Sequence, residues 1–306
     1  MKVLIATQKP FAKAAVDSIK EVIANAGFEP VMLEKYAGAD DLKKAVADAD
    51  AIIIRSDIID ADVLAAAPKL KIVVRAGAGY DNVDLATAKA QGVVVQNTPG
   101  QNSNAVAELV FGMTVMAIRN MYDGTSGSEL RGKTIGIQAF GQVGRNVARI
   151  AKGFDMTVSA LDPYCPAEDI AAAGVTPVQT VNDLYSNNQF VSIHIPATAE
   201  TRGSIGYDLI RLMPQGGVLI NTARKEVIDE AGLAKALEER PDLKYVADVK
   251  PDNADELKER FGNRVFFTPK KMGAQTAEAN INAGIAAAEQ VVAYLRDGIN
   301  RFQVNK

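Results

Sequence analysis

The chain has 306 residues, which suggests two domains at about 150 residues each. Apolar residues make up 48% and charged residues 23% of it, as in globular proteins, so the composition argues against disorder. The 34 Lys and Arg stand against 37 Asp and Glu, and the resulting net charge of −3 argues against nucleic acid as the main partner. No apolar run is long enough to span a bilayer or to form a signal-peptide core, so we expect a cytoplasmic protein with no membrane partner.

A single cysteine, Cys165, and a single histidine, His194, restrict the chemistry further. One cysteine allows no disulfide within the chain and no cysteine-rich zinc site. No cluster of histidine and carboxylate residues has the spacing of metal ligands, so no metal site is expected. A mechanism that requires a histidine base has only His194 to use.

Short apolar runs alternate with amphipathic segments along the whole chain, which is typical of parallel βαβ units. In the first third, the pattern predicts strands at 3–6, 51–54, 71–74 and 93–96 and helices at 11–26 and 85–91. Asp84 is a natural N-cap for the second of these helices, and Gly92 is its terminating glycine. A long helical pattern then runs from about 103 to 121.

A second series of elements begins at Lys133. Strands are predicted at 134–138, 157–161, 190–195, 218–221, 243–249 and 265–268, with helices at 142–152 and 277–296. Sequential βαβ connections imply right-handed crossovers and ligands at the carboxyl ends of the strands. The sequence therefore predicts an α/β protein with two doubly wound parallel-sheet domains and a cleft between them.

A glycine-rich turn between a predicted strand and a predicted helix indicates a dinucleotide site. Gly141 would let the backbone approach a pyrophosphate, and Gly144 would allow the helix to pack closely on the sheet. Ala139 replaces the first glycine of the usual pattern, and its methyl group crowds the turn without forbidding it. Asp162, 18 residues beyond Gly144, would accept hydrogen bonds from ribose hydroxyls and repel a 2′-phosphate, which favours NAD over NADP. The residues expected to bind the cofactor here are Gly141, Gln142, Val143 and Asp162.

The alternative interpretation of this segment is an ordinary strand–helix turn followed by a helix-capping aspartate. The glycine motif alone is a weak signal. Its position between a strand and a helix, together with the acidic residue after the next strand, favours the cofactor site.

Several motifs along the chain belong to one pattern. They are Arg-Ala-Gly-Ala-Gly-Tyr-Asp-Asn-Val-Asp at 75–84, Asn-Thr-Pro-Gly-Gln-Asn-Ser at 97–103 with Ala-Glu at 107–108, His-Ile-Pro at 194–196, Asn-Thr-Ala-Arg at 221–224, Ala-Asp-Val at 247–249, Thr-Pro at 268–269 and Gly-Ala at 273–274. In order and spacing, over nearly the whole chain, these motifs resemble those of one enzyme family, the D-isomer-specific 2-hydroxyacid dehydrogenases.

The resemblance implies a Rossmann NAD-binding domain at 99–283, inserted into a flavodoxin-like substrate domain built from 1–98 and 284–306. It implies a homodimer that forms through the nucleotide-binding domain. It also implies further contacts with NAD, from Ile195, Pro196, Thr222, Ala223, Asp248 and Gly273. Because the chain ends at Lys306, we do not expect the C-terminal regulatory extension of longer members, or serine feedback through it.

Two basic residues are expected to carry the chemistry. Arg224 matches the family's catalytic arginine, whose guanidinium grips a carboxylate or carbonyl in a fork, although Lys225 replaces the glycine usual after it. Lys270 stands where the family has its acid–base histidine, and Asn253 stands where the carboxylate paired with that histidine belongs. A neighbouring carboxylate would hold a lysine protonated. The absence of the carboxylate is therefore consistent with a lysine that acts as the base. We expect Lys270 to move the proton, in a partly buried setting with Arg224 and Lys271 nearby.

His194 is the competing base, and a merely solvated Lys270 in a protein without activity is the third interpretation. In the family, the loop that carries the histidine of the His-x-Pro motif lines the cofactor instead of moving protons. A buried or cofactor-lining role is therefore the better interpretation of His194.

The first domain carries groups suited to a phosphorylated acid. The loop Ala76, Gly77, Ala78 and Gly79 would offer backbone N–H groups to a carboxylate, while Arg55, Ser56 and Arg75 would bind a phosphate. The alternative is surface pairing of the two arginines with Asp57 and Asp81. The favoured substrate is a small phosphorylated 2-hydroxy acid, D-3-phosphoglycerate, oxidised to 3-phosphohydroxypyruvate at the start of serine synthesis. A glycerate, hydroxypyruvate or lactate dehydrogenase and a non-catalytic NAD-sensing dimer remain as alternatives.

Overall fold

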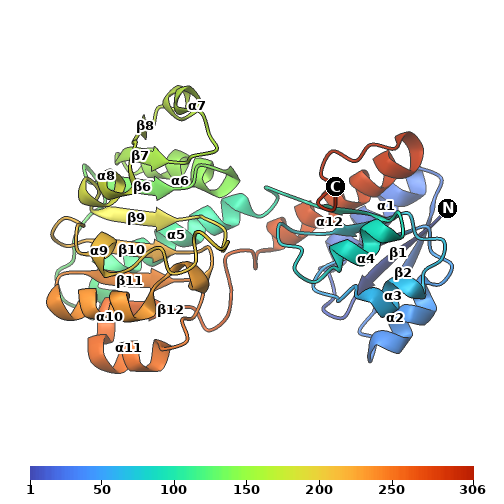
Figure 1. The fold of residues 1–306 in the computed structure, drawn as a ribbon, viewed down its shortest axis with the longest axis horizontal. Coiled ribbons are helices and arrows are strands. Elements are labelled where there is room, and N and C mark those ends of the chain that lie inside the picture. The colour runs from blue at the N-terminus through green and yellow to red at the C-terminus, as the bar shows by residue number, and fades with distance from the viewer. The chain divides into compact units, whose positions relative to one another are not determined.

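The computed structural model describes all 306 residues and divides the chain into two compact units (Figure 1). Unit 1 consists of Met1–Asn102 and Thr276–Lys306, and unit 2 consists of Ser103–Gln275. The boundaries therefore differ from those expected at 98/99 and 283/284. The reason is that the helix at Ala277–Asp297 is continuous and belongs wholly to unit 1, so a boundary inside it would divide one packed element.

Unit 1 is a five-stranded parallel sheet in the order β2-β1-β3-β4-β5. Its strands are β1 (Lys2–Thr7), β2 (Glu29–Glu34), β3 (Ala51–Ile54), β4 (Ile72–Arg75) and β5 (Val94–Asn97). Its helices are α1 (Lys13–Asn25), α2 (Ala39–Val46), α3 (Ala61–Ala65), α4 (Leu85–Ala90) and α12 (Ala277–Asp297). This strand order is the flavodoxin-like one, as the resemblance implies.

Alternation along the strands divides the core of unit 1 into two layers. Val3 and Ile5 of β1 face the layer that α1 and α12 cover, whereas Leu4 and Ala6 face the opposite layer. All four side chains are fully buried. Both faces of the sheet are therefore covered, which explains why β1, β3 and β4 appear in the sequence as almost continuous apolar runs.

Unit 2 is a seven-stranded parallel sheet in the order β12-β11-β10-β9-β6-β7-β8. Its strands are β6 (Thr134–Gln138), β7 (Thr157–Leu161), β8 (Thr176–Pro177), β9 (Phe190–Ile193), β10 (Val218–Asn221), β11 (Lys244–Ala247) and β12 (Val265–Phe267). Its α-helices are α5 (Ser103–Ile118), α6 (Gln142–Gly153), α7 (Ala167–Ala172), α8 (Val181–Ser186), α9 (Tyr207–Ile210), α10 (Glu230–Glu239) and α11 (Ala254–Phe261). Short 3₁₀ helices lie at Asn120–Tyr122, Lys225–Val227 and Gly262–Arg264.

The strand orders locate one switch point in each unit. In unit 1, β1 lies between β2 and β3, and in unit 2, β6 lies between β7 and β9. Connections leave opposite faces of a doubly wound sheet at such a point, so the loops diverge there and leave a crevice at the carboxyl ends of the strands. Ligand-binding groups are therefore expected on the loops after β1 and β3 in unit 1 and after β6 and β9 in unit 2.

Local signals in the sequence are confirmed at the helix ends. The Asp84 carboxylate accepts a hydrogen bond from the Thr87 N–H, and Gly92 has a φ of +72°, so both ends of the α4 segment are as predicted. No helix in the chain combines the length and the apolar character that crossing a membrane requires.

Candidate active site

The turn between β6 and α6 has the geometry of a pyrophosphate site. A Cβ atom at Gly144 would lie 2.3 Å from the Ala139 carbonyl oxygen, so only glycine allows this helix to approach the strand so closely. Gly141 is the N-cap, and an added Cβ there would meet nothing within 4 Å. No side chain caps α6 and no acid lies in its first turn, so its N–H groups and positive dipole end are available to an anion. The residues therefore fit the diphosphate of NAD.

The departure from the glycine pattern produces strain at Ala139. Its φ of +79° lies in the left-handed region that disfavours any side chain. We expect Ala139→Gly to raise the free energy of unfolding by about 1 kcal/mol. Chemical denaturation measures this, with Ala151→Gly in the interior of α6 as a control that should lower stability by about 1 kcal/mol or more. An Ala139→Gly variant less stable than the wild type would contradict the strain.

Asp162 is held by the backbone on both sides of its carboxylate. Its Oδ2 accepts a hydrogen bond from the Phe140 N–H at 2.7 Å, and its Oδ1 accepts one from the Tyr164 N–H at 2.8 Å. Each carboxylate oxygen keeps acceptor capacity for a ribose hydroxyl. The next helix, α7, has Pro166 at its N-cap, so Asp162 is not a helix cap. The alternative of a capping aspartate is therefore wrong.

His194 follows β9, and the structure does not suit it to be the base. Its Nε2 lies 2.9 Å from the Ser192 hydroxyl and its Nδ1 lies 3.4 Å from the Thr222 hydroxyl. Burial lowers the pKa of the imidazole to about 3, so the ring is neutral throughout the neutral pH range. A base that is protonated only in strong acid cannot hold the substrate proton near neutrality.

The lowered pKa of His194 predicts acid sensitivity. Its folded pKa lies below the value of about 6.5 for an unfolded chain, so the unfolded state binds more protons below pH 6.5 and stability falls with pH there. Because His194 as a residue is only partly buried, we expect a loss of about 1–2 kcal/mol between pH 7.5 and pH 5. Urea denaturation at pH 7.5 and at pH 5 measures the loss of stability in the wild type and in His194→Gln. The loss in the variant should be smaller by about 1–2 kcal/mol. An equal loss in both proteins would contradict it.

The loop after β10 presents Arg224. The buried side chain of Asn221 accepts a hydrogen bond from the Ala223 N–H and donates one to the Arg224 carbonyl, both at 2.9 Å. Thr222 and Ala223 are buried, whereas Arg224 is half-buried, with Nη1 donating to the Ala223 carbonyl at 3.0 Å. Asn221 is thus a positioning residue that the motif contains but the sequence argument did not single out. A polar residue at the buried end of a parallel strand is the signal that could have identified it.

Lys225, which replaces the glycine usual at this position, has a clear partner. It forms an ion pair with Asp252, whose N–H donates to Glu230 at 2.8 Å. The N–H of Asn253 donates to the other oxygen of Glu230 at 3.0 Å. The arginine loop and the 252–253 loop are therefore tied together, and Asn253, not a carboxylate, occupies the position expected for the histidine's partner.

Asp248 holds the loop that carries Lys270. The carboxylate is fully buried and accepts hydrogen bonds from the Thr268 hydroxyl at 2.9 Å, the Met272 N–H at 2.6 Å and the Gly273 N–H at 2.8 Å. A Cβ at Gly273 would lie 2.9 Å from the Asp248 Oδ2, so this position also needs glycine. Both ends of the loop are therefore fixed by one acid, which gives Asp248 a positioning role in this structure.

Lys270 lies at the exposed tip of this loop. It makes no hydrogen bond and no ion pair, so nothing in unit 2 holds its ammonium group away from a substrate. The expected partial burial is wrong, because Pro269, Lys270 and Lys271 are all exposed where the chain leaves β12.

In unit 1, Arg55 is anchored at the switch point. Its Nη1 donates to the Lys9 carbonyl at 3.2 Å and to the Pro10 carbonyl at 3.1 Å, and its Nη2 donates to the Asn280 side chain. Its guanidinium also lies 5.1 Å from the centre of the Phe11 ring. The Arg55 side chain therefore fastens the loop after β1 and helix α12 to the end of β3.

The alternative of pairing between Arg55 and Asp57 is not found. Asp57 is buried and accepts from the Gln8 N–H at 2.7 Å and the Tyr36 hydroxyl at 2.6 Å. Its hydrogen bond to Arg55 comes from the backbone N–H of that residue, at 3.2 Å, and the two side chains form no ion pair although the Asp57 charge still acts on the Arg55 guanidinium. Ser56 between them is exposed and available to a ligand.

Arg75 and the glycine loop are packed against each other. Arg75 Nε donates to the Arg55 carbonyl at 2.9 Å, and its guanidinium occupies the space that a Cβ at Gly77 would need. Gly77 has a φ of +147°, and its carbonyl accepts from the Thr98 N–H at 3.0 Å. The Ala76–Gly79 loop is thus held between β4 and the end of β5. Its Ala78 is exposed and Gly79 is half-buried.

Comparison with known proteins agrees with this geometry. The family model of the D-isomer specific 2-hydroxyacid dehydrogenase, NAD binding domain, matches residues 104–269, which lie within unit 2. This match covers more than half of the chain. The chain belongs to the D-isomer-specific 2-hydroxyacid dehydrogenase family. Its cofactor is accordingly NAD, and the geometry of the β6–α6 turn and of Asp162 is compatible with a diphosphate and a ribose.

Three relatives illustrate the range of the family. A structure of NAD+-bound 3-phosphoglycerate dehydrogenase from Entamoeba histolytica is 45% identical, with a TM-score of 0.88, covering 100% of this chain and 99% of that one. D-3-phosphoglycerate dehydrogenase of Methanocaldococcus jannaschii is 35% identical over 87% of this chain and 53% of its own length. Hydroxypyruvate reductase of Thermotoga maritima is 35% identical over 82% of this chain and 87% of its own. The chain thus spans about half the length of the M. jannaschii enzyme.

Proposed function

We propose that the protein is an NAD-dependent D-3-phosphoglycerate dehydrogenase, which oxidises D-3-phosphoglycerate to 3-phosphohydroxypyruvate at the first step of serine biosynthesis. The observation that carries the proposal is the cluster of Arg55, Ser56 and Arg75 at the carboxyl edge of the unit 1 sheet. A small unphosphorylated hydroxy acid does not need these cations beside a glycine loop already suited to its carboxylate. The similarity to dehydrogenases of the same name supports the assignment.

Two residues of unit 2 would carry the chemistry. Arg224 would grip the substrate carboxylate and polarise the C2 oxygen, since a guanidinium forms two parallel hydrogen bonds to such oxygens. Lys270 Nζ would take the proton of the C2 hydroxyl as the C–O bond gains double-bond character, and would return it in the reverse direction. Bound NAD supplies the acceptor for the hydride that leaves C2. Asn221 and Asp248 would keep the two loops in place during both steps.

The reductive direction tests the substrate class against the hydroxypyruvate alternative. Consumption of NADH with 3-phosphohydroxypyruvate should give a kcat/KM at least about tenfold above that with hydroxypyruvate, because the phosphate adds charge-assisted hydrogen bonds. The opposite preference would identify a hydroxypyruvate reductase. NAD binding without turnover of either acid would indicate the NAD-sensing protein.

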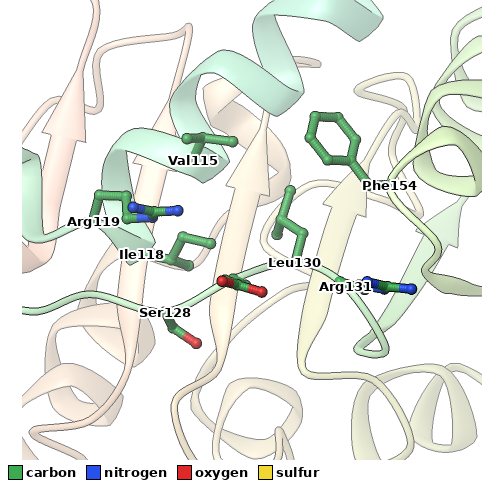
Figure 2. A pocket seen from close by; sticks show the side chains of 8 residues that line it. Val115, Ile118, Arg119, Ser128, Leu130, Arg131 and Phe154 are labelled. Carbon is green, nitrogen blue, oxygen red and sulfur yellow. The ribbon is translucent and has the colours of Figure 1, made fainter.

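We also propose a homodimer that forms through unit 2. Figure 2 shows an apolar pocket between α5 and the segment that precedes β6, with Val115, Ile118, Leu130 and Phe154 around it. Its volume is about 240 Å³, and the charged residues Arg119, Glu129 and Arg131 also line it. Apolar side chains flanked by charged ones on a surface are typical of a protein interface. Sedimentation equilibrium should give twice the 32.5 kDa chain mass, and a monomer at micromolar concentration would contradict the proposal.

A further inference from the structure

The loop after β1 brings a second cation to the phosphate cluster of unit 1. Thr7 Oγ1 donates to the Lys9 carbonyl, and Arg55 Nη1 donates to the same carbonyl at 3.2 Å. The Gln8 N–H is bound by Asp57 at 2.7 Å. The backbone at Lys9 is therefore fixed directly beside the Arg55 guanidinium, at the β1/β3 switch point where a doubly wound sheet binds its ligands.

The side chain of Lys9 is not used by the fold. It is exposed and makes no hydrogen bond or ion pair, whereas every anchor of the loop at this residue uses the backbone carbonyl. Helix α1 begins shortly afterwards at Lys13, with no capping side chain and no acid in its first turn. No carboxylate of this loop or of the first turn of α1 therefore competes for the ammonium group.

Arg55 alone is poorly equipped to hold a phosphate. Of the five N–H donors of a guanidinium, three are already engaged with Lys9, Pro10 and Asn280. Burial lowers the pKa of the Arg55 guanidinium, and the Asp57 carboxylate opposes that shift, so part of the Arg55 charge is already balanced by Asp57. These two donors, with the Ser56 hydroxyl and Arg75, still leave a dianionic phosphate at this edge with acceptor capacity for a further cation.

We propose that Lys9 is a further specificity-determining residue, whose ammonium group binds the phosphate of the substrate beside Arg55 and Ser56. The inference rests on the proposed function, because it names the group that would distinguish a phosphorylated from an unphosphorylated 2-hydroxy acid. Lys9 was not predicted from the sequence, since a lysine in a loop near the N-terminus carries no motif. The carboxyl-edge position after the first parallel strand is the signal that identifies it.

Lys9→Met and Lys9→Arg in the full chain test the proposal. With saturating NAD, Lys9→Met should raise KM for D-3-phosphoglycerate about tenfold at unchanged kcat, because the phosphate contact is made equally in the ground state and the transition state. KM for D-glycerate should stay within about twofold, and Lys9→Arg should stay near the wild type. The matched control is Lys69→Met. It removes an exposed lysine from the connection that leads into β4, at the amino ends of the strands and away from the proposed phosphate site.

A binding measurement separates this inference from the proposed function. Inorganic phosphate should raise the Tm of the wild type and of Lys69→Met, and should raise that of Lys9→Met much less. If the wild type does not oxidise D-3-phosphoglycerate, the proposed function fails, and the phosphate comparison still decides the role of Lys9. An unchanged KM in Lys9→Met, an equal rise for D-glycerate, or an equal phosphate effect on Tm in Lys9→Met would overturn the inference.

Discussion

Replacing Lys270 with alanine is expected to lower kcat by about 10²–10⁴-fold, because general acid–base catalysis contributes about that factor. The effect should fall on kcat more than on KM, since the proton is transferred only in the transition state. The fold should be unaffected, because Lys270 is exposed and Asp248 holds its loop through other residues. Steady-state kinetics and the Tm of the variant, measured together, separate loss of chemistry from loss of structure.

Two further variants sharpen the Lys270 test. Lys250→Ala removes another exposed lysine of unit 2 and should keep full activity. Lys270→His restores the residue type of the family at this position, and it should recover part of the activity with a pH optimum shifted toward the histidine range. Full activity in Lys270→Ala, together with its loss in His194→Gln, would assign the proton transfer to His194 instead.

Arg224→Ala is expected to lower kcat/KM by about 10²–10³-fold, as the loss of one preorganised charged donor does in other enzymes. Arg224→Lys should recover only a minor part, because an ammonium group cannot form the two parallel bonds of a guanidinium. Arg211→Ala, at the C-terminal end of α9, removes an exposed arginine of unit 2 and serves as the control. Equal kinetics in Arg224→Lys and wild type would show that only a positive charge is needed there.

The elements predicted best are those whose signal is local and strong. Strands β3, β6, β7 and β10 were predicted to the residue, because each is a short, mostly apolar run that ends at or just before a polar residue. Strand β2 was missed, because it is an edge strand with half-buried residues and a proline. The segments predicted at 190–195 and 243–249 end earlier, at Ile193 and Ala247, because the chain leaves the sheet there to form the site loops.

At the site, too, features set by neighbouring residues could be predicted, and features set by residues far apart in the chain could not. The glycine turn and Asp162 could be predicted, since the residues that a dinucleotide site requires lie within one βαβ unit. The engagement of Arg55 with Lys9 and Asn280 could not, because it joins residues as far apart as 225 positions in the chain. The exposure of Lys270 was predicted wrongly for a related reason, because burial depends on what packs around a loop and not on its sequence.

The oxidation of D-3-phosphoglycerate tests the account most directly. Formation of NADH is followed with purified protein at alkaline pH, with the keto acid product trapped because oxidation of an alcohol by NAD runs uphill, and D-glycerate is the matched substrate without the phosphate. We expect turnover with both acids, with a kcat/KM for D-3-phosphoglycerate at least about tenfold above that for D-glycerate. Turnover with D-glycerate alone, or with neither acid despite measurable NAD binding, would contradict the account.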